Sequence, residues 1–439
     1  MRNTSLLVVA AGILTGACLS HSWARGAAHT AQAIDWPQFR FDDRHDGVNK
    51  FEKTLGKKNV TSLGLAWQAQ LGDIVDASSP TVANGIAYIG STDGTLWAYP
   101  ADGCGQSFCD APLWQSTNLA QIRDTPTVAN GVVYVGSQTD QDSNDGKLNA
   151  FAAEGCGQEV CAPLWQGDAG SESILESSPT VADGVVYIGT FGGKLYAFDA
   201  DGCGTALCQP LWTGQTGGSI ESTPTVYKGT VFVGSDDGKL YAFKAKGCHK
   251  STCKPLWTGA LDSPVFSSSP AIANGLIYIA GQHELAAFDV KGCGAKSCQP
   301  VWQASDDNEF FNASPAVSEG HVYISWSTGL AAYAAKGCGQ QTCDKEWILF
   351  GDGFQAAVLS SPTVANGVVY AGRNTGEVLA WDAGPCGNFV CHNIWSGRTE
   401  DQIVSSSPTV VNGKLYIGSA DDHVSEDISG RLYVWSLQR

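Results

Sequence analysis

The sequence predicts an all-β protein, an eight-bladed β-propeller of four-stranded blades whose ring is closed by an N-terminal strand joining the C-terminal blade. Two observations lead to this fold class. A unit opened by Ser-Pro or Thr-Pro and a tight Gly-containing turn recurs eight times, and six of the seven spacings between its prolines are 45 to 47 residues. A tryptophan recurs at a fixed place relative to each unit, and a period near 45 with four short strands is typical of propeller blades. The prolines are Pro80, Pro126, Pro179, Pro224, Pro270, Pro315, Pro362 and Pro408, and the tryptophans are Trp67, Trp114, Trp165, Trp212, Trp257, Trp302, Trp347 and Trp395.

The unit from 177 to 214 shows how each blade is built, with strands A to D counted outwards from the ring centre. SSPTVADG predicts strand A and its turn, because Asp-Gly tolerates the positive φ of a tight hairpin. VVYIGT predicts strand B, GGKLYAFDA predicts strand C, and PLWTG predicts strand D with Trp212. A large aromatic residue at one fixed place suits packing between adjacent blades.

The count of strands predicts how the ring closes. Eight A–B–C sets and eight D strands are present, but the first D strand precedes the first set and none follows the last. We therefore expect residues 65–71 to complete the C-terminal blade, which hides the open strand edges. The predicted organisation is an export signal and processing region over 1–33, a lead-in segment over 34–64, and the propeller over 65–439.

The first residues resemble an export signal. Arg2 precedes a short apolar stretch, Leu6 to Leu14, which is too short to span a membrane. Small-residue cleavage patterns end at Ala24 and at Ala33. The alternative is lipid attachment at Cys18, although its preceding residues match a lipobox poorly. We expect a periplasmic, cell-envelope or extracellular protein without a transmembrane span.

Fourteen of the 15 cysteines form seven Cys-x4-Cys pairs, one in each C–D connection of blades one to seven. Zinc sites usually combine Cys-x2-Cys with further ligands, so metal binding and redox chemistry are weaker interpretations than local disulfides. The odd thiol is Cys18, inside the predicted signal, which agrees with an oxidising compartment. The pairs are Cys104–Cys109, Cys156–Cys161, Cys203–Cys208, Cys248–Cys253, Cys293–Cys298, Cys338–Cys343 and Cys386–Cys391.

Charge and motifs exclude several function classes. The formal net charge is −17 and no arginine-rich run is present, so we expect no binding to nucleic acid. No Gly-x-Ser-x-Gly, His-Glu-x-x-His or phosphate-cradling glycine loop occurs. We expect a monomer whose partner is a protein or a small ligand.

The candidate site lies on one face. The A–B turns and the cystine-bearing C–D turns share one face, whereas the variable B–C and D–A segments share the other, where sites are usually built. Residues just before each proline should line the mouth of the channel. The candidate ligand or cation-binding residues there are Asp76, Arg123, Asp124, Glu176, Glu221 and Asn312. Carboxylates with an amide oxygen suit Ca²⁺, but solvated positions of a repeat also drift without function.

A second candidate for metal binding is the long B–C loop of blade two. Asp140, Asp142 and Asn144 resemble the beginning of a calcium loop. The match then fails, because the glycine comes one place late and Phe151 stands where a bidentate Glu is needed. An ordinary solvated loop is the simpler interpretation.

The openings SSPTVANG, the YIGS and YVGS strands and the KLYAF strands resemble the pyrroloquinoline-quinone (PQQ)-like repeat family, as does the Trp36-Pro37-Gln38-Phe39-Arg40 segment before them. The resemblance implies one of two roles. PQQ-dependent alcohol dehydrogenases are secreted eight-bladed enzymes with Ca²⁺ beside the quinone, and BamB-type propellers act by binding. By position, Arg123 and Glu176 or Glu221 match the cofactor-side Arg and calcium-side Glu of the enzymes.

The sequence departs from both groups. It has no adjacent pair of cysteines and no clear counterpart of the catalytic base or the stacking Trp of the enzymes. It lacks a good lipobox and carries hairpin cystines, unlike the BamB type. We expect an exported, non-catalytic binding or scaffold propeller, with a PQQ- and calcium-dependent dehydrogenase as the alternative. Fold alone does not settle function.

Overall fold

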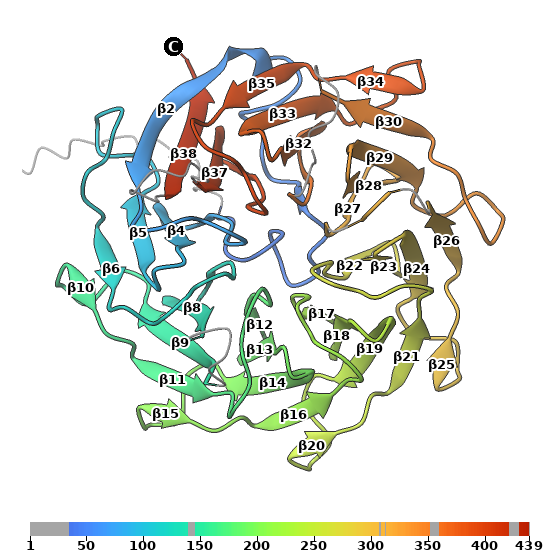
Figure 1. Cartoon of the computed structure of the whole chain (residues 1–439), viewed down its shortest axis with the longest axis horizontal. Coiled ribbons are helices and arrows are strands. Elements are labelled where there is room, and N and C mark those ends of the chain that lie inside the picture. The colour runs from blue at the N-terminus through green and yellow to red at the C-terminus, as the bar shows by residue number, and fades with distance from the viewer. Residues whose placement is uncertain are drawn as a thin grey trace, which may run out of the picture. The chain divides into compact units, whose positions relative to one another are not determined.

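The computed structural model is an eight-bladed β-propeller, as the sequence predicts (Figure 1). It describes residues 35–138, 145–306, 309–311, 313–351, 360–420 and 430–438, all within one compact unit. Each blade is a twisted antiparallel sheet whose strands follow one another from the centre of the ring outwards. Because neighbouring strands are antiparallel, the A–B and C–D turns lie at one end of every blade.

The strands of the blades are short, and the innermost ones have three residues each. The A strands are β3 (Thr81–Ala83), β7 (Thr127–Ala129), β12 (Thr180–Ala182), β17 (Thr225–Tyr227), β22 (Ala271–Ala273), β27 (Ala316–Ser318), β31 (Thr363–Ala365) and β36 (Thr409–Val411). The B strands are β4 (Ile86–Gly90), β8 (Val132–Ser137), β13 (Val185–Gly189), β18 (Thr230–Ser235), β23 (Leu276–Gly281), β28 (His321–Trp326), β32 (Val368–Gly372) and β37 (Lys414–Ala420).

The C and D strands complete the blades. The C strands are β5 (Leu96–Pro100), β9 (Lys147–Ala152), β14 (Lys194–Asp199), β19 (Lys239–Lys244), β24 (Glu284–Asp289), β29 (Gly329–Ala334), β33 (Glu377–Asp382) and β38 (Gly430–Leu437). The D strands are β6 (Trp114–Ser116), β11 (Trp165–Asp168), β16 (Trp212–Gln215), β21 (Trp257–Ala260), β26 (Trp302–Ser305), β30 (Trp347–Phe350), β35 (Trp395–Arg398) and β2 (Leu63–Gln70).

The predicted closure of the ring is confirmed. β2 lies antiparallel to β38, in a register that runs from Leu63 opposite Leu437 to Gln70 opposite Arg431 (Figure 1). The C-terminal blade therefore takes its outermost strand from the N-terminal side of the chain. This closure ties the two ends of the propeller together and leaves no blade incomplete.

The repeated tryptophans pack between blades, as expected. Trp114 is buried, and its indole N–H donates to the carbonyl of Ala153 in the next blade at 3.0 Å. Gly155 lies against the same ring, and a Cβ there would stand 2.6 Å from Trp114 Cδ1. Its φ of +81° also favours glycine. In six of the seven hairpins the glycine before the first cysteine lies against a repeated tryptophan in this way, whereas Pro385 precedes Cys386 in the seventh.

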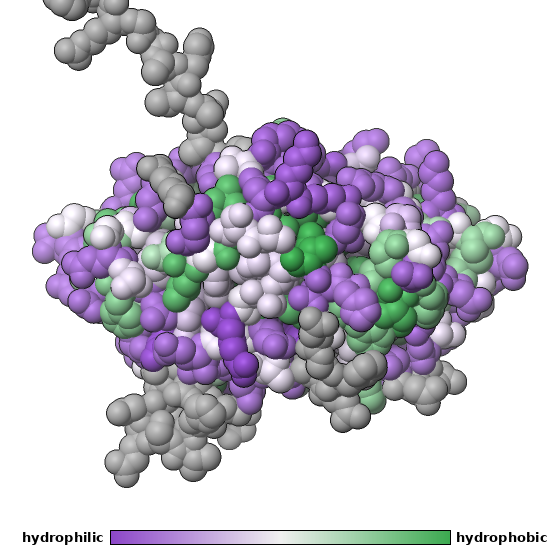
Figure 2. Space-filling model, turned by 90° about the horizontal axis from the view of Figure 1, so that it is seen from above, coloured by the Kyte–Doolittle hydropathy of each residue, from purple (hydrophilic) through white to green (hydrophobic). Residues whose placement is uncertain are grey.

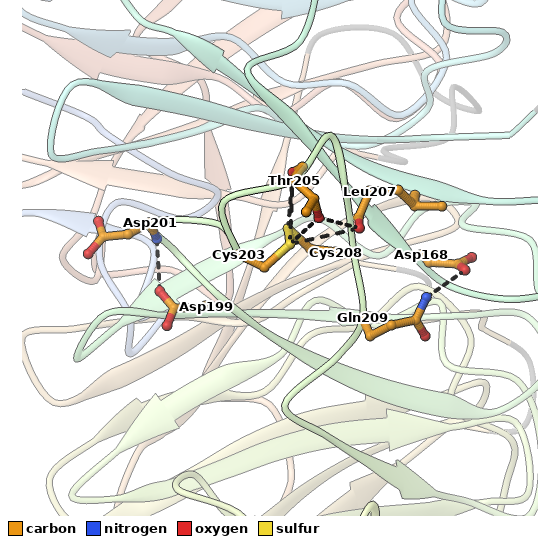
Figure 3. The surroundings of a disulfide bond; sticks show 8 residues. All are labelled: Asp168, Asp199, Asp201, Cys203, Thr205, Leu207, Cys208 and Gln209. Carbon is orange, nitrogen blue, oxygen red and sulfur yellow. Dashed lines mark hydrogen bonds between the residues drawn. A yellow bond between two sulfur atoms is a disulfide. The ribbon is translucent and has the colours of Figure 1, made fainter.

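The seven predicted disulfides are present, with Cα–Cα distances of 5.6–5.7 Å. Figure 3 shows Cys203–Cys208 beside Asp168 of the preceding blade, which accepts a hydrogen bond from Gln209 at 3.0 Å. Seven disulfides place the propeller in an oxidising compartment. They also lie far from the variable face, so they brace hairpins without forming a site.

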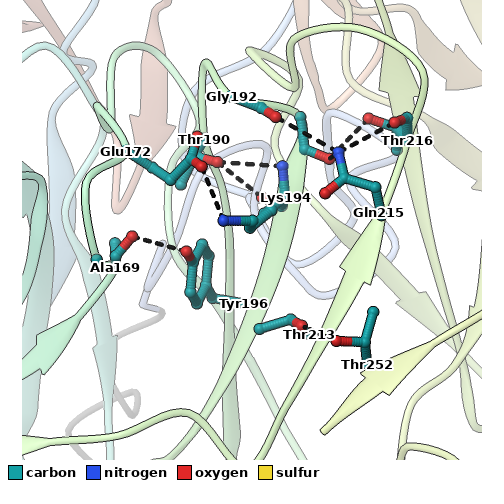
Figure 4. Close-up of polar contacts among 12 residues, drawn as sticks. Ala169, Glu172, Thr190, Gly192, Lys194, Tyr196, Thr213, Gln215, Thr216 and Thr252 are labelled. Carbon is teal, nitrogen blue, oxygen red and sulfur yellow. Dashed lines mark hydrogen bonds and ion pairs between the residues drawn. The ribbon is translucent and has the colours of Figure 1, made fainter. Parts of the chain in front are cut away.

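The hairpins have a role that the sequence did not predict. Five of them extend the neighbouring blade by a parallel fifth strand, and the other two make a single parallel bridge, Phe108 with Gln68 and Thr342 with Gln303. Thr213 of β16, for example, donates its N–H to Ser251 at 2.7 Å, and its side chain meets Thr252 at 3.3 Å (Figure 4). Each hairpin therefore covers the outer edge of the blade before it. The fifth strands are β10 (Val160–Cys161), β15 (Leu207–Cys208), β20 (Thr252–Cys253), β25 (Ser297–Cys298) and β34 (Val390–His392).

The lead-in segment crosses the centre of the ring (Figure 1, dark blue) and visits the blades in chain order. It includes β1 (Val48–Asn49) and a 3₁₀ helix, η1 (Val60–Ser62). Its carbonyls accept hydrogen bonds from the middle residue of one A strand after another, so it fills the channel with satisfied backbone groups. The donors are Val82 to Trp36 (3.0 Å), Val128 to Pro37 (2.6 Å), Val226 to Asp43 (2.8 Å), Ile272 to Arg44 (2.8 Å), Val317 to Asp46 (2.9 Å) and Val364 to Gly47 (2.9 Å).

The outside of the ring is largely hydrophilic, with apolar side chains in separate patches (Figure 2). Such scattered exposure is normal for a folded protein. Within the described ranges, no helix is long and apolar enough to cross a bilayer.

Candidate functional site

The residue before each proline builds a closed collar around the channel. The backbone N–H of each such residue donates to the hydroxyl of its counterpart in the next blade, and the last closes onto the first. This explains why Ser or Thr stands there in all eight units. The donor–acceptor pairs are Ser79–Thr125, Thr125–Ser178, Ser178–Thr223, Thr223–Ser269, Ser269–Ser314, Ser314–Ser361, Ser361–Ser407 and Ser407–Ser79, at 2.9–3.1 Å.

A second set of hydrogen bonds, from the preceding blade or from the lead-in segment, reaches seven of the eight proline carbonyls. In blade three the hydroxyl of Thr180 instead lies 3.3 Å from Nε2 of the buried His45. Threonine hydroxyls supply the donor in most blades, as Thr225 does to Pro270 at 2.5 Å. Blades five and six have Ala271 and Ala316 at this position, and Arg40 of the lead-in segment replaces both hydroxyls. The Nη1 atom of Arg40 donates to Pro362 O at 2.7 Å, and its Nη2 atom donates to Pro315 O at 2.5 Å. Burial lowers the pKa of Arg40 to about 9, so it stays charged at neutral pH.

Above these rings lies a funnel, a cavity of about 290 Å³ on the D–A/B–C face. Phe39 of the lead-in segment and Phe266 both line it. Among the lining side chains that the structure describes, Glu176 is the only charged one. The hydroxyl-bearing lining residues are Ser178, Thr223, Ser267, Ser269, Ser361, Ser405 and Ser407. The described lining of the funnel is therefore mainly polar.

The structure brings some predicted site residues together. Glu176 lines the funnel and accepts a short hydrogen bond from Ser267 across the channel. Arg123 and Asp76 form an ion pair, with Nε and Oδ2 3.5 Å apart. Arg123 also lies close enough to favour ionised Glu176, while Asp76 opposes it. Glu221 belongs to the same electrostatic cluster through Glu176.

Asp124 has a different place from the one predicted. Its side chain is only 1 % exposed, and Oδ2 accepts a hydrogen bond from the Gly136 N–H at 2.6 Å. In neighbouring blades a serine makes this contact, as Ser177 does with Gly189 at 2.8 Å. Asp124 therefore replaces a structural serine beneath the funnel wall. Burial raises the pKa of its carboxyl well above the usual range.

Other predicted residues fall outside the described part of the chain. Asn312 and the loop residues Asp140, Asp142 and Asn144 are among these, so the two calcium expectations that involve them stay predictions. Among the residues that are described, no group of three or more His, Cys, Asp or Glu side chains is arranged to hold a metal ion.

Burial governs the acidity of the funnel carboxyls. It raises the pKa of Glu176, against the hydrogen bond from Ser267. It raises the pKa of Glu221 to about 7, and repulsion from Glu176 and Asp236 adds to the shift. Perturbed carboxyls in a cleft are typical of functional sites, although structural networks produce them too.

The raised pKa of Glu221 predicts a pH-dependent effect of Glu221→Gln. The folded state prefers the neutral acid, so wild-type stability is fully present below the unfolded pKa near 4.5 and falls as pH rises through about 7. The variant avoids this loss. We expect its free energy of unfolding to exceed wild type by about 1 kcal/mol at pH 8, after discounting for solvent screening, and to match it at pH 4. Denaturant unfolding at both pH values tests this, with exposed Glu159→Gln as the control; equal gains at both would contradict it.

The sequence did not identify three components of this site: Phe39, Arg40 and the hydroxyl collar. One signal was visible, because Ala271 and Ala316 interrupt the threonines that follow the prolines in the other six units. Because two neighbouring blades lack this hydroxyl, the proline carbonyls that it would bond need a donor from another part of the chain. The identity of that donor depends on the path of the lead-in segment, which has no repeat to reveal it.

The described lining does not fit PQQ. That cofactor carries three carboxyl groups, and buried carboxylates need cations or several donors. Among the described lining residues there is no Lys or Arg and the single charged residue is an acid, while Arg123 is engaged with Asp76. The seven disulfides all join cysteines five residues apart, so none resembles the adjacent-cysteine disulfide of the dehydrogenases.

Comparison with solved structures supports the fold. BamB from Moraxella catarrhalis is 17% identical, with a TM-score of 0.61 over 85% of this chain and 99% of that one. Quinohemoprotein alcohol dehydrogenase from Comamonas testosteroni is 15% identical, with a TM-score of 0.68 over 93% and 81%. A europium-containing methanol dehydrogenase is 14% identical, with a TM-score of 0.61 over 92% and 98%. At such identities the likeness shows the fold alone.

The comparison with protein families is more specific. No curated protein matches the chain. A family model described as outer membrane protein assembly factor BamB matches residues 52–203, 162–383 and 209–439, which together cover the propeller. The chain therefore belongs to this family of PQQ-like repeat propellers.

Proposed function

We propose that the chain is an exported, non-catalytic binding propeller that receives a small ligand or part of an envelope or extracellular protein in its funnel. The observation that carries the proposal is the shape and chemistry of that pocket. Phe39 and Phe266 line it, hydroxyls ring it, and Glu176 makes it asymmetric. A pocket with a few directional polar groups suits binding.

The composition of the lining favours binding over catalysis. The described lining offers hydroxyl groups and one carboxyl but no His, Cys, Lys or Arg. The opposite face repeats the same cystine hairpin from blade to blade, so it offers less asymmetry for recognising one ligand. Disulfides support an oxidising location outside the cytoplasm, where the predicted signal would direct the chain.

A photo-crosslinking residue in place of Phe266, in cells that produce the protein, tests the proposal. We expect one discrete adduct, weakened when Glu176→Gln is added, because that change removes the charge of the lining. Leu256 is the matched control, since it is 45% exposed beside the 37% of Phe266 but lies next to a cystine hairpin. Equal labelling from both positions would contradict a funnel site.

The dehydrogenase alternative has its own measurement. Purified protein is mixed with PQQ and Ca²⁺, and dye-linked oxidation of alcohols is followed. We expect no turnover above the cofactor alone, because the described lining lacks the cations that the quinone carboxylates need. Quinone-dependent turnover would overturn the proposal of a non-catalytic protein.

A further inference from the structure

The eight outer strands differ in one respect. In seven blades the residue after the tryptophan donates its N–H to a carbonyl of the next hairpin, at 2.7–2.9 Å. Blade seven ends in β35, where the equivalent residue is Ser396. Within the described ranges, no strand or isolated bridge pairs with the outer side of β35, and its sheet ends there. The seven covered residues are Gln68, Gln115, Gln166, Thr213, Thr258, Gln303 and Ile348.

Exposure agrees with the hydrogen bonding. Ser396 is exposed, whereas the seven equivalent residues are half-buried. Trp395 is also the most exposed of the eight repeated tryptophans, at 9% compared with 1–7% for the others. In the part of the chain that the structure describes, the outer edge of blade seven is therefore open in a way that no other blade shares.

The cause is the way the ring closes. Blade eight ends with β38 and takes its D strand from β2, so it has no C–D hairpin to lay on β35. The lead-in segment compensates only for the tryptophan. Leu55, Val60 and Leu63 pack with Trp395, whose indole N–H donates to Leu63 O at 3.1 Å. The lead-in segment covers the indole, but among the described residues it does not pair with the N–H and C=O groups on the outer side of β35.

The charge of the lead-in segment near this edge favours an acidic partner. Four lysines lie in the lead-in segment between positions 50 and 58, in a chain of net charge −17. Lys57 reaches Asp382 of blade seven at 2.5 Å, which places this group beside the beginning of β35. Lys53, Lys57 and Lys58 line a surface groove of about 380 Å³. The one acidic residue within the run, Glu52, is buried and accepts backbone hydrogen bonds.

We propose that the open edge of β35 binds an extended, acidic segment of a partner protein, which adds a parallel strand as five of the hairpins do inside the chain. Strand addition to a free edge is a common mode of peptide recognition. The hairpins show the geometry that this edge accepts, and the lysines select acidic side chains near the start of the added strand. This surface lies on the outer rim, so it is independent of the funnel.

A proline scan tests whether the edge is free. Ser396→Pro removes an N–H for which the described residues provide no partner, so we expect the melting temperature to stay close to wild type. Thr213→Pro is the matched control, because it removes an N–H that β20 uses, and it should lower the melting temperature clearly. Equal losses in both variants would show that the edge is already covered and would overturn the proposal.

A synthetic peptide tests whether an extended, acidic segment binds the edge of β35. The probe is a synthetic, disulfide-closed peptide of residues 199–210, which contains the Cys203–Cys208 ring and two aspartates. We expect it to slow amide hydrogen exchange at Ser396 about tenfold at saturation, as pairing protects strand amides. Ser396→Pro should abolish binding, and Asp199→Asn with Asp201→Asn in the peptide should weaken it and reduce its salt dependence.

Three outcomes of this experiment would overturn the proposal. The first is a Ser396 amide that already exchanges as slowly as that of Thr213 in the free protein. The second is no protection of Ser396 by the peptide, or protection only elsewhere. The third is self-association that sedimentation detects and Ser396→Pro abolishes, because a second copy would then be the occupant. None of these depends on the funnel, so the function proposed above fails or stands separately.

Discussion

Replacing Arg40 with methionine is expected to lower the free energy of unfolding by about 3 kcal/mol or more. The side chain is 2% exposed, and its guanidinium donates to two carbonyls in the channel, those of Pro315 and Pro362. Methionine fills much of the volume but leaves both carbonyls buried without a donor. Denaturant unfolding of the two proteins at neutral pH measures the difference.

A rescue variant separates this cause from a general loss of packing. Ala271→Thr and Ala316→Thr would supply, in blades five and six, the hydroxyl that Thr225 already provides to Pro270. We expect the triple variant with Arg40→Met to recover most of the lost stability. If the two threonines leave the loss unchanged, the importance of Arg40 must come from its charge or bulk rather than from these two hydrogen bonds.

Removing one cystine is expected to cost about 2 kcal/mol, the chain-entropy value for a six-residue ring. Cys203→Ser with Cys208→Ser opens the hairpin that covers β11, where Gln166 donates to Ala206 at 2.8 Å. We therefore expect faster amide exchange at Gln166 in the same variant. A loss of this size in all seven hairpins would be comparable with the whole stability of a typical domain, about 5–15 kcal/mol.

The same variant supplies its own control. Thr258 is covered by the next hairpin but one, through Lys296 at 2.9 Å, and its exchange should not change. Thiol titration of the unfolded, unreduced wild type should find almost no free thiol in the propeller. Faster exchange at Thr258 would show global destabilisation, and unchanged exchange at Gln166 would show that the disulfide does not hold the fifth strand.

Most of the fold could be predicted because the sequence repeats the blade-forming unit eight times. The Ser-Pro openings, the Gly-led turns and the tryptophans each satisfy a need that recurs in every blade, so the period of the sequence shows the period of the structure. Even the closure by β2 followed from counting D strands. The fifth strands were not predicted, because these two-residue parallel pairings are made by backbone groups. The side chains involved, such as Val160 and Thr252, form no sequence pattern that indicates such a strand.

The site was less predictable, since it is made by departures from the repeat. Position three before the proline correctly indicated the funnel wall at Glu176 and Ser267, because that place follows from the blade geometry. Asp124 stands where other blades have a serine, and it keeps the structural hydrogen bond from Gly136, which the residue type alone did not reveal. Phe39 was invisible, because the lead-in segment is neither periodic nor rich in side chains that signal where it lies.

The order in which the lead-in segment meets the blades has a consequence for how the molecule is made. During synthesis the N-terminal end is produced first, yet its partners at Val317, Val364 and Val410 come last. A chain cut short before the final blade lacks both β38, the partner of β2, and the last contacts of the channel. The lead-in segment can therefore complete its contacts in the channel only after the whole chain has been translated. A truncated product would retain exposed, protease-sensitive ends and would be degraded rather than persist as a smaller ring.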